Sequence, residues 1–87
     1  MYLHLGQDTV LRTQSIIGVF DLENSTVSGM TRDLLSLAQR EGRVVNVSME
    51  MPKSFVLCEE NGKVMVYISQ ISTATLQGRL EALSVKH

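Results

Sequence analysis

Hydrophobic residues along the chain occur at two kinds of spacing, one typical of strands and the other of helices. The run Leu3-His4-Leu5 lies before Gly6-Gln7-Asp8, and Val10-Leu11 lies after it. This pattern predicts a short strand, a turn and a second short strand. Residues 15–21 follow as a longer strand, rich in β-branched and aromatic side chains, in which Gly18 indicates a bulge or a close backbone approach.

A helix is predicted over about Gly29 to Glu41, after a polar stretch at residues 21–25. Ser28 is placed to accept a hydrogen bond from the free amides of the first turn, while Arg40 and Gly42 form a typical stop signal. Apolar residues at three- and four-residue spacing share one stripe of this helix. They are Val27, Met30, Leu34, Leu37 and Ala38.

The second half of the chain predicts three more strands. Residues 43–49 alternate, with one face formed by Val45, Val47 and Met49 and the other by Val44, Asn46 and Ser48. A strand at residues 54–58 and another at residues 63–69 flank Asn61-Gly62. Because Asn-Gly adopts the positive φ values of a type I′ turn, these two strands are predicted to form a hairpin.

A closing helix is predicted from Ser72, whose hydroxyl caps it. Leu76, Leu80 and Leu83 repeat at spacings of four and three residues. Gly78 weakens this helix by about 1 kcal/mol relative to alanine, so we expect it to depend on docking against the rest of the domain.

These elements predict one α+β domain over residues 1–87, with a small, mostly antiparallel sheet of four to six strands and two helices. Residues 16–20, 55–58 and 64–68 are apolar at consecutive positions, so both faces of the sheet need cover. Two arrangements remain open. If both helices pack on one face, the other face needs a partner chain, and symmetry favours a closed homo-oligomer; alternatively, one helix covers each face of a monomer.

The composition indicates a folded domain without a membrane-spanning segment. The chain has 87 residues, of which 44% are apolar and 20% charged, as in an ordinary folded domain. Its longest apolar runs have five residues, far fewer than the ~20 needed to cross a bilayer. The N-terminus shows neither a basic region nor an apolar export segment, so we expect a cytoplasmic protein.

Residues with catalytic or metal-binding potential are sparse. Cys58 is the single cysteine, and we interpret it as a buried thiol acting as a small hydrophobic residue. His4 and His87 lie at opposite ends of the chain, Glu59-Glu60 fits a solvated turn, and no glycine-rich phosphate motif is present. We therefore expect no enzyme activity, cofactor, metal site or small-molecule substrate.

Charge is nearly balanced, with eight basic and nine acidic residues and a net charge of −1. The domain as a whole does not attract polyanions, so any nucleic-acid role needs segregated charge. In a symmetric assembly, one or two phosphate contacts per subunit would repeat around the ring and act multivalently. Scattered surface charge is the ordinary interpretation of such a set. The basic residues are Arg12, Arg32, Arg40, Arg43, Lys53, Lys63, Arg79 and Lys86.

The order and spacing of several short segments resemble the Rem family of small extracellular-matrix (biofilm) regulators from spore-forming Gram-positive bacteria, and the RemB (YaaB-like) branch is the closer fit. The resemblance covers nearly the whole chain. It is carried by Leu3-His4-Leu5-Gly6, Ser15-Ile16-Ile17-Gly18-Val19, Ala38-Gln39-Arg40-Glu41-Gly42, Tyr67-Ile68-Ser69 and Ser72-Thr73-Ala74-Thr75-Leu76-Gln77-Gly78-Arg79-Leu80.

This resemblance implies a ring-forming homo-oligomer that binds double-stranded DNA without catalysis and regulates transcription of matrix genes. The RemA pattern carries a Gly-Arg-Arg segment for DNA contact, where this chain has Glu50-Met51-Pro52. DNA contact is therefore assigned to four other cations, with Arg43 also open to a role as a helix-end cation. They are Lys53, Arg43, Arg32 and Arg12.

A second hypothesis is a ring-forming protein-interaction or scaffolding module that lacks DNA contact. Met49 and Met51 would supply an adaptable apolar loop, and Glu50 would repel phosphate. Core filling and a turn are the ordinary interpretation of these methionines.

Overall fold

The computed structural model describes residues 1–6, 8–22, 29–48 and 50–85. The expected helix cap Ser28 and the apolar residues Val27 and Met49 lie outside this part of the chain, as does most of the polar stretch 21–25. The elements in chain order are β1 (Tyr2–Gly6), β2 (Thr9–Arg12), the short 3₁₀ helix η1 (Thr13–Ser15), β3 (Ile16–Asp21), α1 (Gly29–Arg40), β4 (Val44–Asn46), β5 (Ser54–Glu60), β6 (Lys63–Ser69) and α2 (Thr73–Val85).

The strands divide into two sheets. β1 and β2 form an antiparallel hairpin, while the other four strands form a sheet in the order β3-β5-β6-β4. In this sheet β5 is antiparallel to both β3 and β6, and β4 pairs with β6 in parallel. The mostly antiparallel α+β prediction is confirmed, with the main sheet at the lower end of the expected strand number because the first hairpin lies apart from it.

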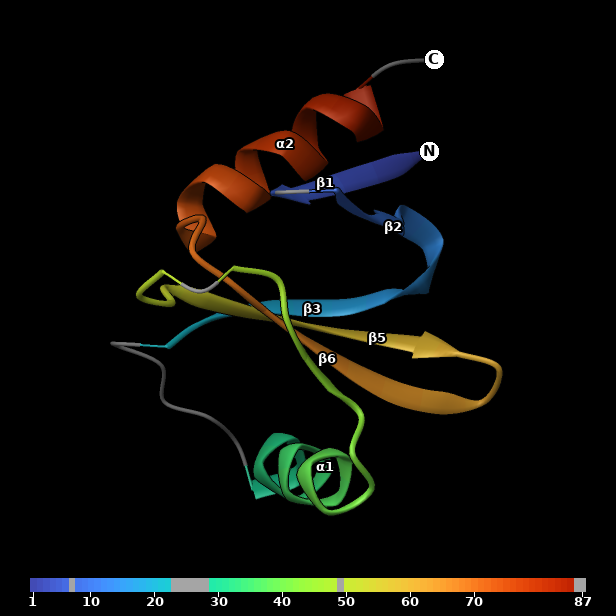
Figure 1. Cartoon of the computed structure of the whole chain (residues 1–87). Helices are drawn as coiled ribbons and strands as arrows, with labels where there is room; N and C mark the ends of the chain where they lie inside the picture. Colours follow the sequence, from blue (N-terminus) through green and yellow to red (C-terminus); the bar gives the residue numbers. More distant parts are fainter. Residues whose placement is uncertain (7, 23–28, 49, 86–87) are drawn as a thin grey trace.

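The main sheet is covered on both faces (Figure 1). The β1–β2 hairpin and α2 lie on one face and α1 lies on the other. Side chains of β5 alternate accordingly: Val56 and Cys58 join the core beneath the hairpin, whereas Phe55 and Leu57 join the core beneath α1. One helix therefore lies on each face of the sheet within the subunit, and the arrangement with both helices on one face is wrong.

Two local turn predictions are confirmed. Asn61 and Gly62 have φ values of 54° and 78°, as a type I′ hairpin turn between β5 and β6 requires. In β3 the register with β5 shifts between Ile16 and Gly18, so this glycine does lie at a bulge.

The predicted helix ends are also confirmed. Gly42 has a φ of 71° and its amide donates to the Gln39 carbonyl at 3.3 Å, while the Arg43 amide donates to the Ala38 carbonyl at 2.8 Å. These two bonds form the Schellman motif that closes α1. At the start of α2 the Thr75 amide donates to the Ser72 hydroxyl at 3.2 Å.

β4 is shorter than the alternation at residues 43–49 predicts. After Asn46 one further backbone bond, from the Val47 amide to the Ile68 carbonyl at 2.9 Å, continues the contact with β6. Beyond it the Ser48 side chain, rather than the backbone, contacts the neighbouring segment. None of the helices in the described ranges is long and apolar enough to cross a membrane.

Candidate nucleic-acid interface

The segment Glu50–Lys53, which we call the β5 corner, precedes β5 and is anchored at both ends. The Glu50 amide donates to the Ser48 hydroxyl at 3.1 Å. At the other end the Lys53 amide donates to the Ser69 carbonyl at 2.9 Å, and the Lys53 carbonyl accepts from the Leu22 amide at 3.0 Å. The backbone of the β5 corner is therefore fixed where β3 ends and β6 ends.

Side chains of the β5 corner project into solvent. Glu50, Met51, Pro52 and Lys53 are all exposed, and 79% of the Met51 surface is accessible. The backbone of Lys53 is thus fixed by hydrogen bonds while its side chain is exposed to solvent. This arrangement is suited to contact between the ammonium group and a phosphate. Glu50 places a negative charge in the same segment, which opposes such contact.

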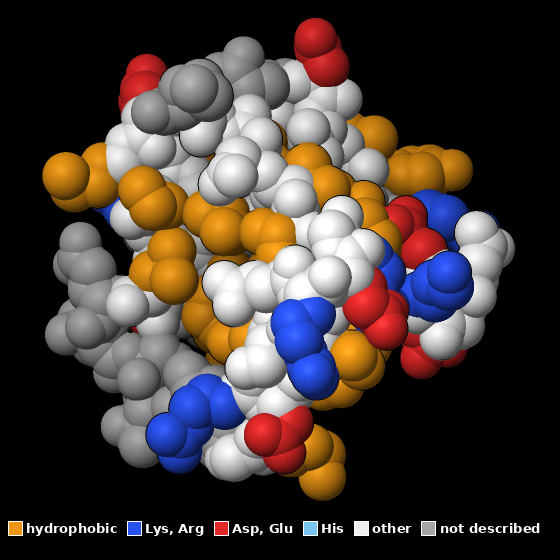
Figure 2. Space-filling model, turned by 60° about the horizontal axis from the view of Figure 1, so that its bottom comes forward, with side chains coloured by type: hydrophobic (Ala, Val, Ile, Leu, Met, Phe, Trp, Pro, Cys, Tyr) orange, Lys and Arg blue, Asp and Glu red, His pale blue; other side chains and the backbone are white. Residues whose placement is uncertain are grey.

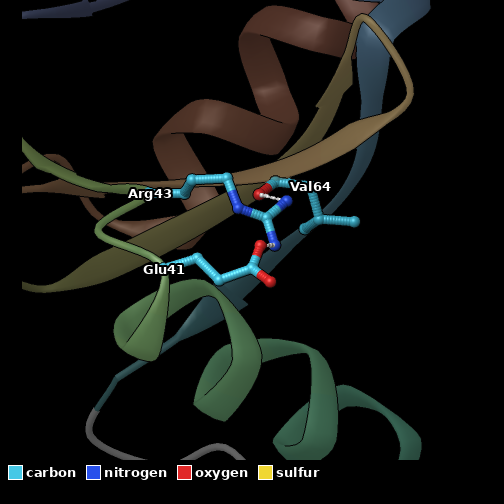
Figure 3. Close-up of polar contacts among 3 residues, drawn as sticks. All are labelled: Glu41, Arg43 and Val64. Carbon is cyan, nitrogen blue, oxygen red and sulfur yellow. Dashed lines mark hydrogen bonds and ion pairs between the residues drawn. The ribbon is translucent and has the colours of Figure 1, made fainter.

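The Arg43 side chain extends toward Glu41 and the Val64 carbonyl (Figure 3). This side chain is only 12% exposed and forms an ion pair with Glu41. Its Nη1 donates to the Val64 carbonyl at 3.1 Å. Arg43 therefore fastens the end of α1 to the start of β6, which favours its interpretation as a helix-end cation over a DNA contact.

The remaining two candidates lie on different parts of the molecule. Arg12 is exposed at the end of β2, before β3 begins, whereas Lys53 lies beyond the opposite end of β3, next to the pair Asp21–Ser54. The six residues of β3 separate them by roughly 20 Å. Arg32 is exposed on α1, and it lines a cavity together with Leu22, the residue bonded to Lys53.

The four predicted cations therefore do not form one patch within one subunit. Lys53 and Arg32 both neighbour Leu22, while Arg43 and Arg12 lie toward the other end of the sheet. Arg79 resembles Arg43 in its bonding, because its Nη1 donates to the His4 carbonyl at 2.9 Å and joins α2 to β1.

Sequence reasoning did not identify the cavity beside α1. Arg32, Ser36 and Gln39 recur at positions i, i+4 and i+7 and so line it from one face of the helix. That spacing is visible in the sequence, but the polar face of an amphipathic helix ordinarily faces bulk water. Nothing in the spacing reveals that this polar face borders a hollow in the sheet.

The interpretation of Cys58 as a buried thiol is confirmed, since its side chain is fully buried. Burial, with a smaller contribution from the charge of Glu60, raises the pKa of this thiol to about 11. A thiolate is therefore scarce near neutral pH, and the group is poorly suited to nucleophilic chemistry.

Sequence comparisons with known proteins match this chain over nearly its full length. The family model described as "RemA-like: Extracellular matrix regulatory protein A-like" matches residues 2–80. The chain is also 33% identical over 81 residues to extracellular matrix regulatory protein B of Bacillus subtilis (strain 168), and the match covers 93% of this chain and 91% of that protein.

Proposed function

The chain belongs to the RemA-like family of extracellular matrix regulatory proteins, in the branch of regulatory protein B, and from this membership we propose that it is a non-enzymatic, DNA-binding regulator of matrix genes. In this proposal it acts in the cytoplasm as a ring-shaped homo-oligomer. Its similarity to extracellular matrix regulatory protein B of Bacillus subtilis supports the matrix-regulatory part of the proposal.

The β5 corner supports DNA contact. Lys53 is exposed, and its backbone is held by bonds to Ser69 and Leu22 at 2.9 and 3.0 Å, so its ammonium extends from a rigid base. One cation per subunit is a weak contact by itself, but identical copies around a closed assembly bind one polyanion multivalently. Arg32 supplies a second exposed cation near the same end of the sheet.

Open strand edges support assembly. Within the described residues β3 pairs only with β5 and β4 only with β6, so each carries one edge without a strand partner. Edges of this kind accept strands from other chains. Ile17 lies on β3 and is 52% exposed, which adds apolar surface for such a contact.

Salt titration tests the proposal directly. The mass of the protein in solution is measured first, and binding of a double-stranded DNA fragment is then followed across ionic strengths. Each phosphate contact contributes about −0.9 to the slope of log affinity against log salt, so a multivalent assembly gives a slope of several units. Undetectable binding at low salt by an assembled protein would refute DNA binding.

The exposure of Met51 favours a second candidate, a ring-forming interaction module without DNA contact. A methionine with 79% of its surface accessible, next to the exposed carboxylate of Glu50, suits an adaptable protein contact better than a phosphate. Met51→Asp should then abolish partner binding in pull-down experiments. If every interaction survives this substitution, the second candidate loses its support.

A further inference from the structure

A cavity of about 300 Å³ opens between α1 and the main sheet. Its floor includes Val44, Phe55 and Ile68 from three different strands, and its wall includes Arg32, Ser36 and Gln39 from α1. Figure 2, which brings the α1 side of the molecule forward, shows hydrophobic side chains gathered in a band across it, with Lys and Arg side chains at the border.

The cavity follows from the width of the sheet. Outer strands of a four-stranded sheet lie about 15 Å apart, since neighbours are spaced by about 4.8 Å, whereas a helix with its side chains is about 10 Å wide. On the opposite face a hairpin and a helix share the cover, but α1 lies alone on its own face in the described structure. Part of the apolar floor therefore stays open beside it.

The mouth of this cavity is cationic. Arg32 is exposed there, and no acidic residue is among the described residues that line the cavity. Across the described part of the chain, no side chain or carbonyl accepts a hydrogen bond or ion pair from the Arg32 guanidinium. A guanidinium fork matches a carboxylate with two parallel hydrogen bonds.

We propose that the cavity binds a small amphipathic carboxylate, with an aliphatic tail on Phe55, Val44 and Ile68 and its carboxylate on Arg32. The volume lies at the lower end of the range for small-molecule sites, which suits one short acyl chain. A partner helix, about 10–12 Å across with its side chains, is too wide to enter it. Such a ligand is an effector rather than a substrate.

Titration of the intact chain with hexanoate, octanoate and decanoate, followed by amide chemical shifts, tests this site. We expect saturable binding of one ligand per chain, with affinity rising about fourfold for each added methylene. Octanol carries the same tail without the charge, and should bind about tenfold more weakly than octanoate. The measurement needs no DNA, so it decides the site independently of the function proposed above.

Variants separate the two parts of the site. Arg32→Gln should lower octanoate affinity about tenfold and leave octanol affinity unchanged, because it removes the ionic hydrogen bonds alone. Arg40→Gln is the matched control, since it removes an exposed cation from the same helix outside the cavity. Ser36→Trp fills the cavity and should abolish binding of both ligands; Ser36→Leu replaces it if the tryptophan variant does not fold.

Several outcomes overturn the proposal. One is a titration that does not saturate with hexanoate, octanoate or decanoate. Another is equal affinity for octanol and octanoate. A third is an equal loss of octanoate affinity in Arg32→Gln and Arg40→Gln. A Ser36→Trp variant that loses no ligand binding but has a smaller mass in solution would show that copies of the chain contact each other through this face, which also overturns it.

Discussion

The backbone amide of Leu22 donates a hydrogen bond to the carbonyl oxygen of Lys53 at 3.0 Å. Leu22 lines the cavity beside α1, and Lys53 is the exposed cation of the β5 corner. This single bond therefore joins the wall of a candidate ligand site to the residue with the best geometry for DNA contact. Movement of Leu22 would be transmitted to the corner through the backbone rather than through flexible side chains.

Lys53→Ala should weaken binding to every DNA sequence by a similar factor, because a phosphate contact carries no sequence information. It should also reduce the magnitude of the slope of log affinity against log salt by about one unit for each subunit that contacts DNA. Fluorescence anisotropy across salt concentrations measures both quantities. Lys63→Ala is the control, since Lys63 is exposed at the start of β6, at the opposite end from the corner. Equal losses in the two variants would contradict a role specific to Lys53.

Glu50→Gln should strengthen DNA binding by about two- to fivefold at low salt, because it removes a negative charge from the segment that carries Lys53. The gain should shrink as salt is added. Glu59→Gln removes an exposed carboxylate near the β5–β6 turn and serves as the matched control. An unchanged affinity in Glu50→Gln would show that DNA does not approach the β5 corner.

Arg43→Met should lower the free energy of unfolding by about 1–3 kcal/mol, since the Val64 carbonyl loses its charged donor while the aliphatic packing remains. Glu41→Gln should cost less than about 1 kcal/mol, because the Glu41 side chain is 49% exposed and the ion pair is screened. Urea denaturation measures both. DNA affinity of the folded Arg43→Met variant should equal that of the wild type; a clear loss would restore Arg43 as a DNA contact.

Ser69→Ala should destabilise the fold by about 1–3 kcal/mol. The buried Ser69 hydroxyl donates to the Leu5 carbonyl at 3.0 Å and accepts from the Ile71 amide at 3.0 Å, so alanine leaves both without this partner. Ser36→Ala, at an exposed helix position, should change stability by less than about 0.5 kcal/mol. Equal stability of the two variants in urea would show that β1 is held to β6 by packing alone.

Alkaline pH should destabilise the protein over a pH range that is determined by the pKa values of Tyr67 and Cys58. Burial, together with the hydrogen bond that its hydroxyl donates to Glu60 at 3.0 Å, raises the pKa of Tyr67 from 10.0 to about 12. The pKa of Cys58 is raised from 9.0 to about 11. Since the folded state holds both protons more tightly, their contribution to stability is complete below pH 9 and is lost between about pH 9 and 12.

Urea midpoints at pH 8, 10 and 11 measure this alkaline loss. Tyr67→Phe and Cys58→Ala should each show a shallower decline than the wild type, relative to their own stability at pH 8. If neither substitution changes the decline, other groups control alkaline unfolding.

Local elements of this fold were predictable because local chemistry specifies them. The Asn61-Gly62 turn, the Gly42 helix stop and the Ser72 cap each depend on residues within a few positions of one another, and the structure confirms all three. The arrangement of the layers was less predictable. Consecutive apolar residues in β5 show that both faces are buried, but they do not show which element covers each face.

The candidate site was predictable in part. Exposure of Lys53 is expected from its charge and its position after Pro52. The burial of Arg43 depends on contact with the Val64 carbonyl, 21 residues away. The cavity depends on the width of the sheet relative to α1, a property of packing that leaves no pattern in the sequence. Long-range contacts therefore distinguish Arg43, which is bonded to Val64 and Glu41, from the exposed Lys53, Arg32 and Arg12.

The strand order β3-β5-β6-β4 also has a consequence for how the nascent chain matures. β3 and β4 are synthesised first, yet their partners β5 and β6 both leave the ribosome later and enter between them. β3 gains a partner strand once β5 is complete at Glu60, but β4 pairs only with β6 and so has no partner strand until Ser69 has been made. The main sheet is therefore completed in a late, cooperative step, and a chain that stalls before the second hairpin exposes apolar strands to chaperones and proteases.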